Sequence, residues 1–112
     1  MMKPTLSPDL RKAAEHQAML CKIFGSTQRV LILWLLAKKE RTVTEIASAL
    51  GASLPSTSQH LRLMELHNIV ESRREHHNIL YQVANNALLD HCLVLANRPE
   101  ELSEDPSIEM EA

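Results

Sequence analysis

The spacing of apolar and polar positions predicts five helices. Apolar residues recur at intervals of three and four, the period of an amphipathic helix. The expected helices cover about residues 8–24, 26–37, 44–51, 53–67 and 86–97. Small polar residues suited to capping stand at their starts: Ser7, Ser26, Thr44, Ser53 and Asn85. The second helix has almost no polar face and is expected to be the most buried.

Two segments alternate in a different way. Residues 69–74 and 78–83 follow the two-residue period of strands, with residues 75–77 as the turn between them. A short strand is also expected at Thr42-Val43, after an exposed charged turn at residues 38–41. The order helix, turn, helix, hairpin predicts a mainly α fold with a small β-hairpin: a winged helix-turn-helix of about five helices and a two- or three-stranded wing.

The helix over residues 53–67 separates its side chains into two sets. We expect an apolar set from this helix and its predecessor to face the core: Ile46, Leu50, Leu54, Leu61, Met64 and Leu66. A polar front is expected to point mostly away: Pro55, Ser56, Thr57, Ser58, Gln59, His60 and Arg62. Hydroxyl, amide and imidazole groups on such a front can hydrogen-bond to base edges and phosphates.

Composition narrows the class of protein. A chain of 112 residues suits one domain, and three aromatic residues imply an aliphatic core. The longest apolar run, residues 30–37, is too short to cross a bilayer, and the first residues lack the apolar stretch of a signal peptide. We therefore expect a cytoplasmic protein without a membrane partner.

Charge divides the chain at residue 98. Residues 1–97 carry 11 Lys and Arg against 8 Asp and Glu, whereas residues 98–112 carry one Arg against six acids. The sequence predicts a mildly basic domain over 8–97, a balance compatible with DNA binding, and an acidic, disordered tail over 98–112. The tail is expected to be a solvated appendage; competition with DNA for the basic face is the alternative.

Three stretches carry a family resemblance: residues 24–33, 55–64 and 74–83. They resemble the lead, the recognition helix and the wing of the arsenic-repressor (ArsR/SmtB) family of winged-helix regulators, and the similarity covers about residues 10–97. Residues 58–61 together with Tyr81 are its most specific part. The resemblance implies a homodimer joined through its first and last helices, which represses an operon by occupying an imperfect palindrome on double-stranded DNA.

The chain departs from the metal-sensing members of that family. Thr42 and Thr44 stand where those members carry thiolates, and a hydroxyl is a poor ligand for a soft metal. Three of the four positions that align with a second family metal site are Asn85, Ala87 and Arg98, which cannot ligate well. We expect no metal and no cofactor; a site that combines His16, His91, Asp90 and a cysteine across the dimer is the weaker alternative. The wing also lacks its usual glycine.

Two cysteines, Cys21 and Cys92, lie on the expected stripes of the first and last helices. Sulfide- and redox-sensing members exist in the family that this chain resembles. A thiol switch, in which a disulfide or polysulfide bridge restrains the dimer, is therefore one interpretation. The other is that each cysteine is a small buried hydrophobe, as most free cysteines are.

The predicted DNA-binding residues fall into three groups. Base contacts are expected from Ser56, Thr57, Gln59 and His60, with Ser53 and Ser58 beside them. Phosphate contacts are expected from Arg62, Arg73 and Arg74, and contacts to the minor groove or backbone from His76, His77 and Asn78. The alternative is that this polar front is only a solvated face.

Two other functions compete with DNA binding. The sequence holds no Gly-rich phosphate loop, no plausible nucleophile–base pair and no carboxylate cluster in its folded part, so we do not expect an enzyme. A winged-helix module that contacts only proteins is the other alternative. The two arginines of the wing, beside a polar recognition helix, favour DNA.

Overall fold

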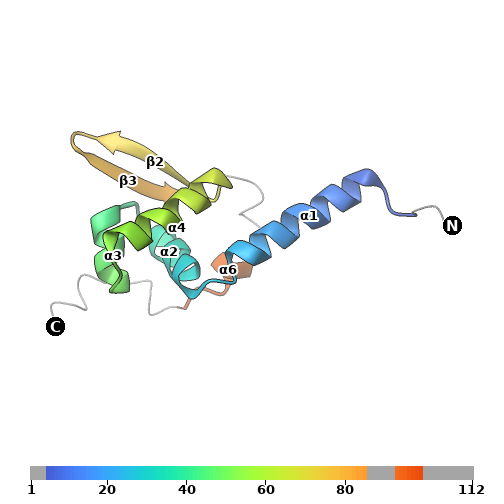
Figure 1. Cartoon of the computed structure of the whole chain (residues 1–112), viewed down its shortest axis with the longest axis horizontal. Coiled ribbons are helices and arrows are strands. Elements are labelled where there is room, and N and C mark those ends of the chain that lie inside the picture. The colour runs from blue at the N-terminus through green and yellow to red at the C-terminus, as the bar shows by residue number, and fades with distance from the viewer. Residues whose placement is uncertain (1–4, 86–92, 100–112) are drawn as a thin grey trace.

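The computed structural model describes residues 5–85 and 93–99 (Figure 1). Its elements follow the chain in the order α1 (Pro8–Ile23), α2 (Thr27–Lys38), β1 (Arg41–Thr42), α3 (Val43–Leu50), α4 (Leu54–Leu66), β2 (Val70–Glu75), β3 (Asn78–Val83) and α6 (Leu93–Ala96). The predicted winged helix-turn-helix is confirmed. The start of the expected last helix and most of the acidic tail lie outside the described residues.

Side-chain caps begin the helices, and three of the predicted caps are confirmed. The hydroxyls of Ser7, Ser26 and Ser53 accept hydrogen bonds from backbone N–H groups three residues on, at 3.1, 3.4 and 3.2 Å. The prediction that Thr44 caps α3 is wrong. Thr42 is the cap: its Oγ1 accepts from the Glu45 N–H at 3.2 Å, and the Glu45 carboxylate accepts from the Thr42 N–H at 3.0 Å.

The core lies where α2, α3 and α4 meet the base of the hairpin. Seven apolar side chains are almost wholly buried there: Ile32, Leu33, Ile46, Leu61, Met64, Ile69 and Val70. Two predicted core residues are not part of it, because Leu54 is 48% exposed and Leu66 is 74% exposed. Leu54 is the first residue of α4 and Leu66 is the last, and the buried part of the helix lies between them.

The three strands form one antiparallel sheet in the order β1-β3-β2. The register of the hairpin runs from Val70 opposite Val83 to Glu75 opposite Asn78, which leaves the two-residue turn His76-His77. His76 adopts a φ of 57°, the left-handed conformation that the missing glycine would have taken. The short strand β1 begins one residue earlier than predicted, at Arg41.

Arg41 corrects the prediction of an exposed turn over residues 38–41. It is only 4% exposed, and its Nε donates to the carbonyl of Leu35 at 3.2 Å. The sheet begins at this residue, so pairing of β1 with β3 draws its side chain against the end of α2.

Helix α1 extends away from the rest of the molecule (Figure 1). Only Leu20 and Ile23, in its last turns, are buried, whereas Leu10 and Met19 are 53% and 41% exposed. At the other end of the chain, the Trp34 indole N–H donates to the carbonyl of Val94 at 2.7 Å and joins α6 to α2. In a single chain, the apolar surface of α1 is therefore open to solvent along most of the helix.

In the part of the chain that the structure describes, no single helix is long and apolar enough to span a bilayer; α1 and α2 pass that test only as a pair, and they are bent by 97° where they meet.

Candidate nucleic-acid interface

Helix α4 presents a polar front because its opposite side is anchored in the core. Thr57, Leu61 and Met64 are its buried residues, at helical spacings of four and three. The side chains of Ser56, Gln59 and Arg62 are exposed on the other side. Three of the predicted contact residues therefore stand on one solvent-facing surface.

Thr57 is not on that surface, so the prediction that it points away from the core is wrong. Its side chain is 0% exposed, and its Oγ1 donates to the Ser53 carbonyl at 2.9 Å. The sequence held a signal for this position, since Thr57 precedes Leu61 by four residues and Met64 by seven. A buried hydroxyl that is satisfied by the preceding turn has a structural role.

Ser58 and His60 stand at the edges of the polar front, each half-buried. Burial, followed by the positive charge of Arg29 on α2, lowers the pKa of His60 below its ordinary value of 6.5. His60 is therefore a neutral imidazole at pH 7, able to donate one hydrogen bond and accept another. The influence of the Arg29 charge places His60 on the side of α4 that is near α2.

The wing packs beside the second half of α4. Ser72 of β2 donates to the Glu65 carboxylate of α4 at 2.7 Å. Tyr81 of β3 lies near the same carboxylate. Burial, and then the negative charge of Glu65, raise the pKa of the Tyr81 hydroxyl. Sequence reasoning missed Glu65 and Ser72, whose hydrogen bond links the wing to the recognition helix.

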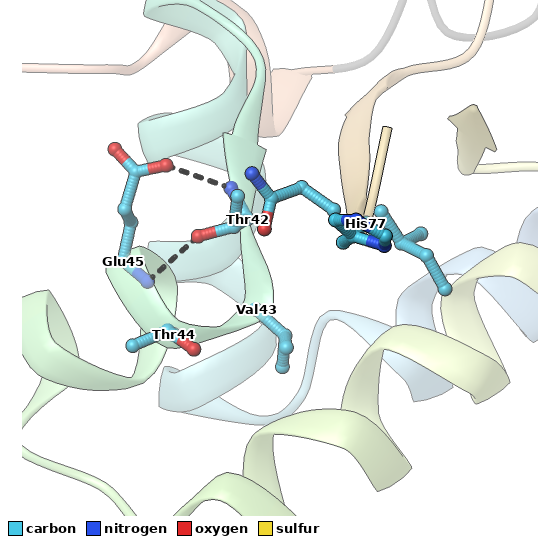
Figure 2. Close-up of a pocket in the computed structure, with 7 residues that line it drawn as sticks. Thr42, Val43, Thr44, Glu45 and His77 are labelled. Atoms are coloured by element: carbon cyan, nitrogen blue, oxygen red, sulfur yellow. Dashed lines mark hydrogen bonds between the residues drawn. The ribbon is translucent and has the colours of Figure 1, made fainter. Parts of the chain in front are cut away.

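The tip of the wing is exposed and stands over the start of α3. His76, His77 and Asn78 are all exposed there, as predicted. An open groove of about 620 Å³ separates the tip from α3 and is lined by residues 42–45 and 77–79 (Figure 2). The hydroxyl of Thr42 and the carboxylate of Glu45 are occupied in the helix cap at this groove.

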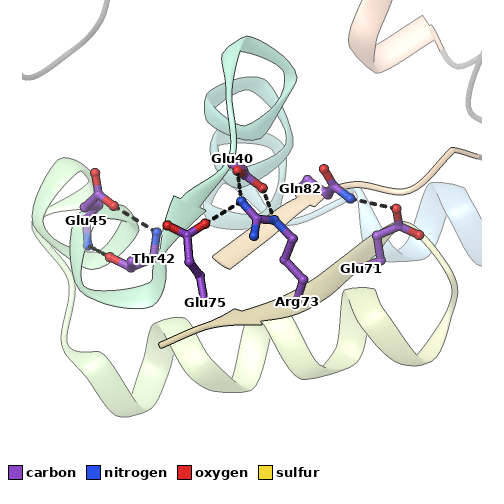
Figure 3. A network of polar contacts seen from close by, with 7 residues as sticks. All are labelled: Glu40, Thr42, Glu45, Glu71, Arg73, Glu75 and Gln82. Carbon is purple, nitrogen blue, oxygen red and sulfur yellow. Dashed lines mark hydrogen bonds and ion pairs between the residues drawn. The ribbon is translucent and has the colours of Figure 1, made fainter. Parts of the chain in front are cut away.

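The two wing arginines differ in their surroundings. Arg73 forms ion pairs with Glu40 and Glu75, and the bonds to Glu40 lower the pKa of that carboxyl group (Figure 3). Arg74 is exposed, and no ion pair engages it within residues 5–85 and 93–99. Sequence reasoning missed Glu40, because a contact across 33 residues leaves no local signal.

Of the two cysteines in the predicted thiol switch, only Cys21 lies among the described residues. Cys21 is a free thiol on α1 and is exposed in the single chain. Cys92 lies outside the described residues, so its distance from Cys21 stays untested. Across residues 5–85 and 93–99, no three His, Cys, Asp or Glu side chains group as metal ligands would.

Comparisons with known proteins agree with this geometry. Residues 26–72 match the model of the bacterial regulatory protein arsR family. The nodulation protein NolR of Rhizobium meliloti is 34% identical over 88 residues, which cover 79% of this chain and 71% of NolR. The transcriptional regulator KmtR of Mycobacterium tuberculosis is 36% identical over 64 residues, which cover 57% of this chain and about half (49%) of KmtR.

A solved structure shows the same architecture. The transcriptional repressor BigR from Xylella fastidiosa superposes with a TM-score of 0.69 at 30% identity, over 79% of this chain and 85% of BigR. The family consists of DNA-binding regulators rather than enzymes. The exposed polar front of α4, the adjoining wing and these similarities together lead to one conclusion: the chain belongs to the arsR family of winged helix-turn-helix transcriptional regulators.

Proposed function

We propose that this protein acts as a homodimer that represses transcription by occupying an imperfect palindrome on double-stranded DNA. The observation that carries the proposal is the separation of buried and exposed polar side chains on opposite sides of α4. Thr57, Leu61 and Met64 fix the helix to the core, and the opposite surface presents free polar groups. A recognition helix needs this combination of a rigid mount and an exposed polar front to enter a major groove.

The base-reading set we propose is Ser56 and Gln59, with Ser53, Ser58 and His60 at its edges. A Gln amide can bond to both hydrogen-bonding groups of an adenine, whereas Ser accepts several bases. Arg62 would add a phosphate contact from α4, and His76, His77 and Asn78 would reach the backbone or minor groove from the tip of the wing. Thr57 is left out because it is buried.

The dimer would form through α1 and the last helix. Helix α1 extends beyond the body of the molecule and leaves Leu10 and Met19 open to solvent. Covering these side chains with a second copy would remove apolar surface from water, which stabilises association. A two-fold axis through this contact would place two copies of α4 in successive major grooves, about 34 Å apart.

The proposal is tested by recovering fragments of genomic DNA with the purified protein and mapping the protected bases. We expect a mass of two chains in light scattering and protected half-sites about one helical turn apart on one face of the duplex. A monomer that enriches no duplex over a mixed-sequence control would contradict the proposal. Enrichment of proteins instead would favour the protein-interaction alternative.

A further inference from the structure

The side chains of Arg73 and Arg74 project from opposite faces of the sheet. They are consecutive residues of β2, and consecutive side chains of a strand alternate between its faces. Ser72 shares a face with Arg74, and its hydroxyl reaches Glu65 of α4 at 2.7 Å. Arg74 therefore stands on the face of the wing that is turned toward the recognition helix. Arg73 stands on the face turned away from it.

Two carboxylates hold the guanidinium of Arg73 (Figure 3). Its Nε donates to one oxygen of Glu40 at 2.9 Å, and a terminal nitrogen donates to the other oxygen and lies 2.9 Å from Glu75. Such a two-pronged pair is the strongest geometry for a surface ion pair. One cation between two anions leaves the cluster anionic, so a DNA phosphate would have to displace a carboxylate against like charge.

The ion pair of Arg73 with Glu40 joins β2, the outer strand of the wing, to the body of the protein. Glu40 lies just before β1, and β3 separates β1 from β2. Strand β1 is only two residues long, and its pairing with β3 ends at Thr42 opposite Leu80. Beyond that pair, no further strand among the described residues flanks the hairpin on this side. The bond from Glu40 to Arg73 crosses the sheet at this point and restrains the outer strand, which carries Arg74.

Arg74 has the surroundings of a contact residue. It is exposed, and within the described ranges no carboxylate pairs with it. Arg62 projects from the exposed front of α4 and is likewise without an ion pair there. These two cations therefore remain available on the side of the molecule where the wing and the recognition helix meet.

We propose that the two adjacent wing arginines have different roles: Arg74 pairs with a DNA phosphate, whereas Arg73 is a positioning residue that fixes the wing through Glu40. This inference rests on the proposed function, since it assigns the contacts made when the protein binds a duplex. It replaces the simpler expectation that both arginines contact phosphate.

The salt dependence of binding separates the two roles. Affinity is measured by fluorescence anisotropy from 50 to 300 mM salt, on a fragment recovered by the wild-type protein and on a mixed-sequence duplex of equal length. Each lost phosphate contact lowers the slope of log affinity against log salt by about 0.9. Arg74→Gln is expected to lower the slope by about that amount for each subunit, whereas Arg73→Gln and Glu40→Gln keep the wild-type slope.

Two outcomes would overturn the assignment. One is an equal loss of slope in Arg73→Gln and Arg74→Gln. The other is a steeper slope in Glu40→Gln, which would mean that a released Arg73 takes up a phosphate. Circular dichroism of each variant checks that the fold is retained.

A direct view comes from the arginine Nε–H signals in nitrogen-15 spectra. In the free protein, the Nε–H of Arg73 is expected to exchange with water more slowly than that of Arg74, and to shift in Glu40→Gln. Addition of duplex is expected to shift Arg74 and leave Arg73 in place; the reverse would overturn the proposal. If the wild-type protein binds neither duplex, the proposed function fails. If the Arg73 signal is unchanged in Glu40→Gln, the ion pair between Arg73 and Glu40 is refuted, whatever the outcome of DNA binding.

Discussion

Thr57 and Gln59 lie two residues apart on α4, yet one is wholly buried and the other is exposed. Both were predicted to contact bases, because both are polar and lie on the expected recognition helix. Exposure separates their roles: Thr57 holds the first turn of the helix to the core, and Gln59 is free to meet a ligand. Residue type alone therefore overstates the number of contact residues on this helix.

We expect Thr57→Ala to weaken folding rather than recognition. It removes a hydrogen bond to the Ser53 carbonyl and a buried methyl group, which together contribute about 1–2 kcal/mol to the free energy of unfolding. Urea denaturation measures this loss. At a temperature where the variant is folded, its preference for an operator over mixed DNA should be unchanged. A lost preference with unaltered stability would return Thr57 to the contact surface.

His60 offers a prediction about pH. Burial and the charge of Arg29 lower its pKa in the folded protein below 6.5. Between the two pKa values the unfolded chain binds more protons than the folded one, so this residue makes stability fall as pH drops below 6.5. Proton NMR should show His60 titrating below 6.5 in the folded protein. In His60→Gln this component of the pH dependence should vanish; a His60 midpoint at or above 6.5 would refute the account.

At the scale of elements, local signals predicted most of the structure. Ser7, Ser26 and Ser53 were recognised as caps because each is a small polar residue directly before an apolar repeat. Two threonines competed at the start of α3, and the chain uses Thr42 because Glu45 stands three residues later, the spacing of a reciprocal capping box. The burial of Arg41 was not predictable, since it depends on pairing with a strand 40 residues away.

One substitution in the turn of the wing is expected to stabilise the folded protein. His76 adopts a φ of 57°, which a residue with a Cβ occupies at a cost and glycine does not. We expect His76→Gly to raise the free energy of unfolding by up to about 1 kcal/mol. His77→Gly is the matched control: it is not among the described residues with positive φ, so it should lower stability. Equal effects of the two glycines in urea denaturation would contradict this reading of the turn.

The start of α3 bears on metal sensing. The Thr42 hydroxyl is committed to the cap of the helix, and hydroxyl groups cannot replace thiolates around a soft metal. We expect micromolar Zn²⁺, Cd²⁺ or arsenite to leave DNA affinity unchanged in an anisotropy titration, with a chelator-treated sample as the control. Stoichiometric release from DNA by any of them, persisting in Cys21→Ser/Cys92→Ser, would point to the histidines as ligands.

At the scale of the whole molecule, the pattern of the sequence specified the fold but not its tertiary contacts. The spacing of apolar residues was enough for α2, α3 and α4, because each packs buried side chains into a single core. The prediction was wrong at the two ends of α4, where Leu54 and Leu66 are apolar but exposed. The bond from Glu40 to Arg73 joins two polar surface residues, and no periodicity marks such a pair.

The most direct test of the account is the operator preference of Gln59→Ala. We take the ratio of affinities for a recovered genomic site and a mixed-sequence duplex, at one salt concentration. Gln82→Ala is the matched control, because Gln82 bonds to Glu71 on the face of the wing that is turned away from α4. Gln59→Ala is expected to reduce the preference by roughly 1–3 kcal/mol for each lost base contact, while Gln82→Ala keeps it. An unchanged preference in Gln59→Ala would contradict the claim that the exposed front of α4 reads DNA sequence.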